Sequence, residues 1–528
     1  MPGAARRGKV LRRIQTMPKF VPSLIALAAT ALASGQAAAQ ASATPEASAS
    51  GLYRSEGMVV LDYQVIPVPQ QPSLDLMGFH ILNKVADGLF VGVGAYAPLV
   101  QGEYGGFMAF DVGAHVQRRI AGRWFANAGL ALGGGGGGKS TQQSIELSGT
   151  GGFGKAYAGL GLDFDGFSVG ANAARMKFRR SAIDHTQLNL FVQMPFTYSV
   201  GSLASAGERL GKADSEAARQ DSSANTLTLG LDNFRQIDPR GSNKADIHLA
   251  DLQFAHYMSE HRYWYASLGV GYRGLPLYNH FIGGLGYRFD LAPRWSLHAQ
   301  LGLGSGGYAP EKIDTGAGLL VYPRLSAEYA ITQNFGLALT SGYLYAPKGS
   351  SKNYTLGAAL NYHLQAPRRA AAASTAPDGA VFRGYRFSLL QQTETGVHVR
   401  GLDRPSIHML TAQLDTLVSD HWYIPIRAGV AYNAYLGYPG YGELLAGVGL
   451  QSKYRQGDRF QFFGQLLGGT NVHGLILNPG IGMNISLGDQ LAVHASAGKT
   501  KATSTGNGNF SATSLALGLT YRFSVPSW

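Results

Sequence analysis

The sequence of 528 residues contains 44 basic and 32 acidic side chains, 72 glycines, 27 tyrosines and no cysteine. The lack of cysteine excludes a disulfide-stapled scaffold and a lipoprotein acylated through cysteine. Only 14% of the residues are charged, and abundant glycine and tyrosine favour strands and tight turns over helices. Residues 1–39 hold six basic side chains, so the remaining chain has a net charge of about +6 (12 minus 6), too modest to indicate nucleic acid as a partner.

Residues 1–39 have the three parts of a secretory signal peptide. Basic residues come first, an apolar segment covers residues 20–33, and small residues follow at 37–39. Translation from Met17 would leave a conventionally short basic region, so Met1 and Met17 both stay open as the start. Residues 40–57 then form a spacer of small residues without periodicity.

Alternation of apolar with small or polar residues begins near Met58 and recurs to the end of the chain. A half-buried strand produces this period of two, because successive side chains point to opposite faces. We predict three copies of an eight-stranded repeat, at residues 58–198, 226–365 and 381–523. Between them, residues 199–225 and 366–380 lack the alternation and are interpreted as linkers. The copies correspond most clearly where their fifth strands open, at Arg123 and Trp124, Arg294 and Trp295, and Arg459 and Phe460.

The last strand shows the alternation most clearly and closes on the order aromatic, any residue, Phe. Behind a signal peptide, and in three copies, such a strand resembles the assembly signal of bacterial outer-membrane β-barrel proteins. The Phe usually ends the chain in that family. Here a tail of residues 524–528 follows, so Phe523 or Trp528 would be the terminal aromatic. The residues expected to form the assembly signal are Leu515, Leu517, Leu519, Tyr521 and Phe523.

The resemblance implies an all-β fold of transmembrane antiparallel up-and-down barrels in the outer membrane of a Gram-negative bacterium. Outer-membrane lipid, lipopolysaccharide and the barrel assembly machinery are the partners that it implies. No apolar run after the leader is long enough for a membrane helix, and only closed barrels otherwise satisfy the backbone in lipid. Short connections predict the periplasmic end, and longer ones, such as residues 67–73, predict the extracellular end. Both linkers would then be periplasmic.

Two architectures fit this pattern. The linkers are far longer than the turns inside a repeat, which favours three tandem eight-stranded barrels over one 24-stranded barrel. The small inward residues, with few charges among them, favour the wide barrel, because an eight-stranded interior is filled by side chains. Pairing of residues 515–523 with residues 385–390 would close a separate third barrel, whereas pairing with residues 58–66 would make one ring. Phe110 should face lipid and Asp111 the interior of its barrel. Likewise, Ile424 should face lipid and Arg427 the interior.

The residues give little support for a catalytic site. Some eight-stranded outer-membrane barrels are lipid A acylhydrolases or acyltransferases that use His and Ser. His115, His298 and His494 are expected to point inward, but none has a Ser and an acid at a spacing that the sequence can certify. We therefore expect no catalytic, cofactor-binding or metal residue. A lipid A-modifying enzyme is kept as an alternative that needs His and Ser within hydrogen-bond reach near the outer rim of one barrel.

Residues 133–140 read GGGGGGKS and match the letters of a phosphate-binding loop. Phosphate binding also needs a helix directly after the loop, and the next residues have no helical pattern. We interpret the run as a surface loop.

Aromatic residues are expected in two places. Trp124, Trp264, Trp295 and Trp422 lie near strand ends, where an interfacial girdle would place them. Tyr435, Tyr438 and Tyr441, among glycines and a proline, fit a girdle less well and form a candidate surface-binding loop. The expected function is non-enzymatic: an envelope scaffold or surface-binding protein in polysaccharide or surface-layer handling. A passive pore, made by one wide barrel, is a further alternative.

Overall fold

The computed structural model describes residues 52–139, 145–211, 215, 225–276, 278–307, 312–332, 334–363, 380–502 and 509–527. The predicted signal peptide, most of the spacer and residues 366–379 of the second linker lie outside the described residues, as does Trp528.

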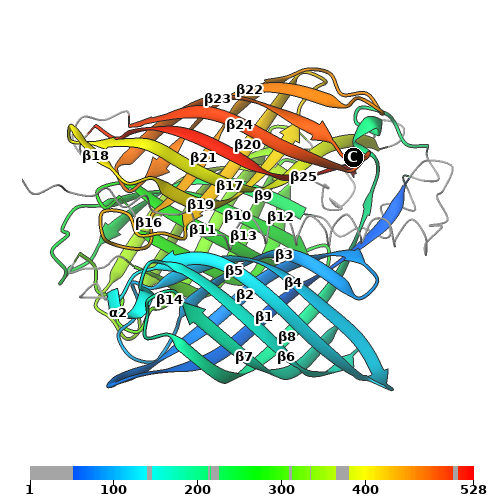
Figure 1. The fold of residues 1–528 in the computed structure, drawn as a ribbon. Helices are drawn as coiled ribbons and strands as arrows, with labels where there is room; N and C mark the ends of the chain where they lie inside the picture. The colour runs from blue at the N-terminus through cyan, green and yellow to red at the C-terminus, as the bar shows by residue number, and fades with distance from the viewer. Residues whose placement is uncertain are drawn as a thin grey trace, which may run out of the picture. The chain divides into compact units, whose positions relative to one another are not determined.

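Residues 53–200 form a closed antiparallel barrel, barrel 1, drawn in blue to cyan in Figure 1. Each strand pairs with the next, and β1 pairs with β8, so no strand is left with an unpaired edge. The strands are β1 Tyr53–Val68, β2 Gln71–Ala86, β3 Leu89–Pro98, β4 Met108–Ala121, β5 Trp124–Gly136, β6 Gly152–Phe164, β7 Phe167–Phe178 and β8 Asp184–Val200.

Barrel 2 closes in the same way, with β16 pairing back to β9. Its strands are β9 Asn225–Gln236, β10 Ile247–Tyr257, β11 Arg262–Arg273, β12 Asn279–Ala292, β13 Trp295–Gly307, β14 Leu319–Ala330, β15 Phe335–Tyr345 and β16 Lys352–His363. Short helical turns occur at α2 Ile145–Ser148 and η1 Leu203–Ser205. Among the described helices, none has the length and hydropathy that crossing a membrane would require.

Barrel 3 has eight strands around its wall and a short extra strand, β18, that extends a hairpin from β17. Its strands are β17 Val381–Val399, β18 Leu402–Arg404, β19 Ile407–Leu417, β20 Trp422–Ala431, β21 Gly442–Gln451, β22 Phe460–Asn471, β23 Gly474–Ser486, β24 Leu491–Ala502 and β25 Ser511–Ser527.

The pairing of the last strand decides between the two predicted architectures. Residues of β25 pair with β17, from Tyr385 opposite Phe523 to Leu390 opposite Gly518. The prediction of three separate eight-stranded barrels is confirmed, and the 24-stranded alternative is wrong. Strands also reach further than the predicted repeats: β1 begins inside the predicted spacer, and β25 extends to Ser527 inside the predicted tail.

Connection lengths follow the expected asymmetry with exceptions. The long connection predicted at residues 67–73 is wrong, because β1 and β2 continue to Val68 and Gln71 and leave a tight turn at residues 69–70. A second tight turn, at residues 472–473, lies at the same end of barrel 3. The remaining connections at this end are longer, and we call it the long-loop end. At the opposite end, the short connection expected between the fourth and fifth strands is wrong for barrel 3, where residues 452–459 separate β21 from β22.

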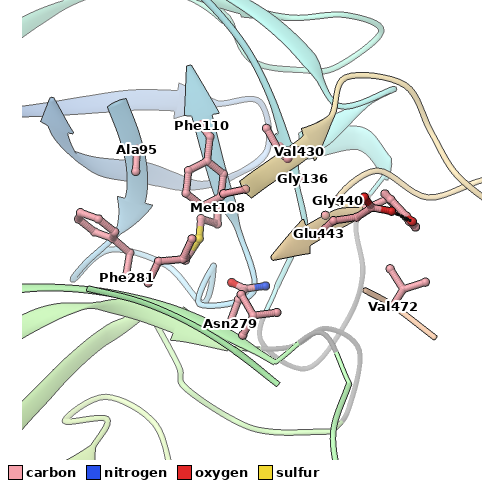
Figure 2. Close-up of a pocket in the computed structure, with 18 of the residues that line it drawn as sticks. Ala95, Met108, Phe110, Gly136, Asn279, Phe281, Val430, Gly440, Glu443 and Val472 are labelled. Carbon is pink, nitrogen blue, oxygen red and sulfur yellow. Dashed lines mark hydrogen bonds between the residues drawn. The ribbon is translucent and has the colours of Figure 1, made fainter. Parts of the chain in front are cut away.

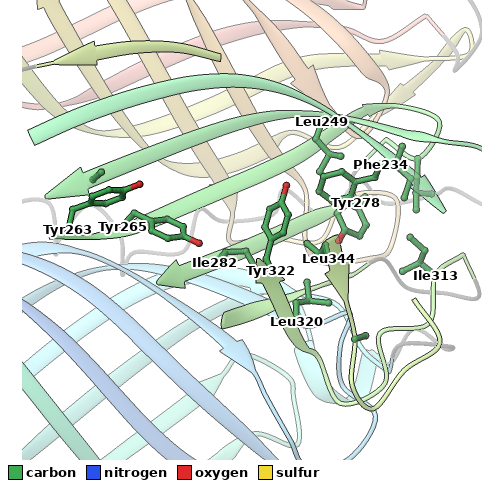
Figure 3. Packing of buried hydrophobic residues seen from close by; sticks show 14 of the residues in the cluster. Phe234, Leu249, Tyr263, Tyr265, Tyr278, Ile282, Ile313, Leu320, Tyr322 and Leu344 are labelled. Atoms are coloured by element: carbon green, nitrogen blue, oxygen red, sulfur yellow. The ribbon is translucent and has the colours of Figure 1, made fainter. Parts of the chain in front are cut away.

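The predicted division of side chains between the two faces is confirmed where it was specific. Asp111 and Arg427 are buried inside their barrels, whereas Phe110 and Ile424 point outward. The expectation that Phe110 faces lipid is wrong, because its ring packs against the cluster that contains Trp264 and Phe281 of barrel 2. At the long-loop end of barrel 2, an apolar cluster fills the interior, and Figure 3 shows Tyr278, Tyr322 and Leu344 converging there. Equivalent clusters occur in barrels 1 and 3.

The three barrels contact one another directly. Barrels 1 and 2 share a backbone hydrogen bond from Gly105 N to Gly316 O (3.0 Å) and an aromatic contact between Phe79 and Trp264. Thr470 Oγ1 of barrel 3 donates to Gly271 O of barrel 2 (3.2 Å). At the opposite end, the backbones of Gly201 and Ser524 bond each other reciprocally at 2.9 Å, joining the first linker to β25.

Two glycines of the run at residues 133–138, Gly134 and Gly136, lie where barrel 1 closely approaches barrel 3. The first four residues of the run are the end of β5, so the interpretation as a surface loop is wrong for them. A Cβ on Gly134 would lie 2.5 Å from Ala431 O, and one on Gly136 would lie 2.6 Å from Pro439 Cβ. Larger residues would therefore push barrel 3 away from barrel 1.

Candidate functional site

The interior of barrel 1 holds a buried ion-pair network, which corrects the expectation of few inward charges. Lys155 Nζ lies 2.8 Å from Asp62 Oδ2, and both side chains are almost fully buried. His80 lies between this pair and a second carboxylate, with Nε2 3.6 Å from Asp111 Oδ2. Polar side chains around this network leave a cavity of about 30 Å³, and a single water needs roughly 10–15 Å³ by the same kind of measure. This cavity therefore has room for isolated waters and not for a continuous water column.

Barrel 2 is filled by a different set of charges. The Arg324 guanidinium lies 3.3 Å from Asp232 and 3.7 Å from Asp251. Nearer the short-turn end, Glu328 lies between His298 (3.2 Å) and His363 (2.6 Å). A charge buried in the barrel interior without a partner would be strongly destabilising. The ion pairs join side chains from several strands, so each network holds these strands together across the interior.

The interior of barrel 3 also holds a network of buried charged and polar side chains. Arg386 Nε donates to Asp415 Oδ2 at 3.0 Å, and Arg427 Nε donates to Gln413 Oε1 at 2.8 Å. Further hydrogen bonds link Gln392 to Glu394 (2.8 Å) and to Glu443 (3.3 Å). Among the described residues, packed polar side chains fill the middle of each interior and apolar clusters fill its long-loop end, which leaves no open lumen of the kind that a passive pore needs.

The outward surfaces have the opposite character. Large apolar side chains are exposed along the strands of all three barrels, and Ile481 is 72% exposed. Exposed rings open five of the described strands at the short-turn end: Trp124, Phe167, Trp295, Trp422 and Phe460. A soluble protein rarely exposes so extensive an apolar surface, whereas a bilayer requires it. This chain is a membrane-spanning β-barrel protein.

Only the first part of the predicted assembly signal belongs to this exposed surface. Leu515 and Leu517 are exposed, while the alternating Ala516, Thr520 and Arg522 are buried in the interior. The rings at the end of the strand stack on each other, 5.5 Å apart. Tyr521 OH lies 3.1 Å from Tyr53 OH of barrel 1, and Phe523 packs against a cluster that includes Tyr362 of barrel 2, so these two rings do not face open lipid. The members of the signal, Leu515, Leu517, Leu519, Tyr521 and Phe523, all lie in β25, and their role in assembly stays a prediction.

Trp264, which we expected in the aromatic girdle, lies elsewhere in the barrel protein. It is buried against Phe79 of barrel 1, with ring centroids 6.0 Å apart. Period-two alternation places this ring outward correctly but does not distinguish a lipid-facing position from a contact between barrels.

The candidate surface-binding loop is only partly exposed. Tyr438 is 50% exposed, but Tyr435 and Tyr441 are buried inside the mouth of barrel 3, so the expected exposure is wrong for these two. Tyr435 OH lies 2.6 Å from His473 Nε2, and Tyr441 OH donates to Glu443 Oε1 at 2.5 Å. Burial raises the pKa of Tyr435 to about 12, so this hydroxyl stays protonated for its hydrogen bond. Two tyrosines of the loop, Tyr435 and Tyr441, therefore close the mouth of barrel 3, and the third, Tyr438, is exposed at the surface.

Two of the three inward histidines lack a catalytic arrangement. His115 Nδ1 lies 2.8 Å from Tyr157 OH and its Nε2 lies 3.4 Å from Gln117 Oε1, so within the described chain neither ring nitrogen faces a Ser. His298 lies near both Ser296 and Glu328, but the same nitrogen, Nε2, faces both groups. A nucleophile relay needs opposite nitrogens, one for the hydroxyl and one for the orienting group.

His494 does have a relay geometry that the sequence did not reveal. Its Nδ1 lies 3.1 Å from Asn484 Oδ1, and its Nε2 lies 3.1 Å from Ser496 Oγ. All three side chains point into barrel 3, and the Phe463 ring packs 5.0 Å from the imidazole. The site lies in the first half of β24, on the short-turn side, and not at the outer rim. No group of three or more His, Cys, Asp or Glu side chains in the described residues could hold a metal ion.

Comparisons with known proteins give only distant likenesses. No protein-family model matches the chain, and no curated protein matches it. A mutant of the ferric enterobactin receptor from Pseudomonas aeruginosa is 9% identical, with 89% of this chain and 81% of that chain covered and a TM-score of 0.28. The siderophore receptor PirA from Acinetobacter baumannii is 10% identical, with 89% and 80% covered and a TM-score of 0.28. The NanC porin is 9% identical, with 56% and 98% covered and a TM-score of 0.17. These values are low, and no residue role is taken from these proteins.

Proposed function

We propose that this barrel protein is a non-enzymatic scaffold in the outer membrane of a Gram-negative bacterium. The filled interior of each barrel supports this proposal most directly, because it leaves the outer walls and the loops as the surfaces available for contact. Direct hydrogen bonds between barrels, such as that from Gly105 to Gly316, suit a protein whose role is to hold several loop sets in one arrangement.

The partner class proposed for these loops is polysaccharide or a surface layer outside the cell. Tyr438 and Leu436 are exposed on the loop between β20 and β21, and an exposed ring beside polar loops is a common contact for sugars and proteins. The linkers would face the periplasm, where the barrel assembly machinery would also meet β25 during insertion. Lipopolysaccharide would surround the long-loop end.

The conductance of the purified protein tests the scaffold against the passive pore. We expect no stepwise current in planar lipid bilayers, because ion pairs such as Lys155 with Asp62 and Arg324 with Asp232 occupy the interiors. A known porin inserted under the same conditions provides the positive control. Regular current steps that scale with the amount of inserted protein would contradict the proposal and favour the pore.

A second candidate function, hydrolysis of an acyl ester, is favoured by one observation: the order Ser496, His494 and Asn484 across the two imidazole nitrogens. A hydrolase would activate Ser496 Oγ through His494 as general base. We expect instead that Ser496 is unreactive, because packed side chains surround it inside an eight-stranded barrel.

Labelling with a fluorophosphonate probe distinguishes these two functions. We expect no covalent label on the folded protein. Label that disappears in Ser496→Ala, but persists in the control Ser514→Ala on the neighbouring strand, would establish the hydrolase and contradict the non-enzymatic proposal. Ser514 is a suitable control because it is also buried in the interior of barrel 3.

A further inference from the structure

A large cavity lies between the three barrels and extends to the mouth of barrel 3, where Tyr435, Tyr441 and His473 line it. Its volume is about 1050 Å³, at the upper end of the roughly 300–1,000 Å³ of small-molecule sites. Figure 2 shows Phe110 of barrel 1, Phe281 of barrel 2 and Val430 of barrel 3 around it. Each barrel contributes outward, apolar side chains at this level. The middle of the cavity is therefore as apolar as a lipid-facing wall, but the barrels separate part of it from the bulk lipid.

The lining changes from apolar to basic toward the long-loop end. Lys312, Arg400 and Arg404 line the cavity there, in loops or at the β18 hairpin. In the described part of the chain, none of these three side chains forms an ion pair with a carboxylate. The two acidic residues of the lining turn their carboxylates into their own barrels: Asp111 faces His80, and Glu443 accepts from Tyr441.

We propose that this cavity binds one anionic glycerophospholipid. Its acyl chains would lie against the apolar walls, and its phosphate would contact Lys312, Arg400 and Arg404. Two observations favour this occupant over others. The basic rim complements a negatively charged headgroup, and a cavity of about 1050 Å³ suits one two-chain amphiphile better than a glycolipid with many chains. The inference rests on membrane insertion of the barrels and not on the scaffold role.

Bound lipid would contact the apolar walls of all three barrels at once. An empty apolar cavity of this size would cost the surrounding side chains their dispersion contacts, and a flexible acyl chain can restore them without a fixed shape. The site would therefore join the three barrels as well as hold a ligand.

Native mass spectrometry of the full protein, released from nanodiscs that contain phosphatidylglycerol and phosphatidylcholine in equal amounts, tests the proposal. We expect one retained phospholipid per protein, with phosphatidylglycerol favoured about tenfold. No retained lipid, retained detergent only, or retained lipopolysaccharide from native membranes would overturn it, while leaving the barrel fold and the scaffold proposal intact.

Two variants locate the retained lipid. Ala428 points into the cavity from β20, whereas Ala497 points to open lipid from β24 of the same barrel. Ala428→Trp is expected to reduce the retained lipid at least tenfold, and Ala497→Trp to leave it unchanged. Equal retention in both variants would overturn the site.

The headgroup contact has its own test, which adds no bulk to the cavity. The triple variant Lys312→Gln, Arg400→Gln, Arg404→Gln is expected to retain both phospholipids equally. The control Lys499→Gln, Lys501→Gln changes basic residues of β24 that do not line the cavity, and should keep the preference for phosphatidylglycerol. A preference that survives in the triple variant would overturn the assigned headgroup contact.

Discussion

Replacement of Asp62 by alanine is expected to destabilise barrel 1 by about 3–5 kcal/mol, because it leaves the Lys155 ammonium buried without its carboxylate. The free energy of unfolding can be followed by urea titration of the purified protein in detergent micelles. Trp124 is the only tryptophan of barrel 1, so its fluorescence in a variant that lacks the other four reports on this barrel alone.

A surface pair provides the matched control for this measurement. Lys84 and Glu56 are also 2.8 Å apart, but both are substantially exposed, so Glu56→Ala should cost about 1 kcal/mol or less. The double variant Asp62→Leu, Lys155→Met should recover most of the stability lost in Asp62→Ala, because it removes both buried charges and keeps the volume. Equal losses in Asp62→Ala and Glu56→Ala would show that the interior of barrel 1 is wet and open.

Cysteine labelling of intact cells should give an all-or-none difference between the two ends of barrel 3. The chain has no native cysteine, so a single introduced thiol is the only target. Leu402, at the tip of the β17–β18 hairpin, and Leu487, in the turn after β23, are 56% and 58% exposed. We expect a membrane-impermeant maleimide to label Leu402→Cys in whole cells and to leave Leu487→Cys unlabelled.

Lysis with detergent supplies the control, since both thiols should then react at similar rates. Labelling of Leu487→Cys and not Leu402→Cys in whole cells would reverse the proposed orientation. If neither thiol is labelled in whole cells, then either the protein is not in the outer membrane or its long-loop end is covered.

The sequence was sufficient for most of the fold because two signals depend only on local chemistry. Period-two alternation identified strands and their outward faces, as the opposite placement of Phe110 and Asp111 shows. The length of the linkers then separated three barrels from one, and the pairing of β25 with β17 confirmed this. The connection at residues 67–73 was missed because strands can continue past the membrane into tight turns, which composition alone does not reveal.

The interiors could not be predicted in the same way, because their contacts join strands that are far apart in sequence. Asp62 lies in β1 and Lys155 in β6, and the two meet only after the barrel closes. The relay at His494 likewise depends on the register that places this residue opposite Asn484. Tyr435 and Tyr441 were expected outside because glycine and proline mark a loop, but those residue types do not indicate whether the loop folds back into the barrel mouth.

The contacts between barrels have a consequence for how such a protein can change over time. A homotrimer must use the same interface three times, so one substitution alters all its subunit contacts together. Here the three contacts between barrels use different residues: Gly105 with Gly316, Thr470 with Gly271, and Gly201 with Ser524. Because the barrels belong to one chain, each has a high effective concentration for its neighbours, and a weakened contact need not separate them. Each copy can therefore diverge independently, and a single mutation can alter one contact while the other two hold the assembly together.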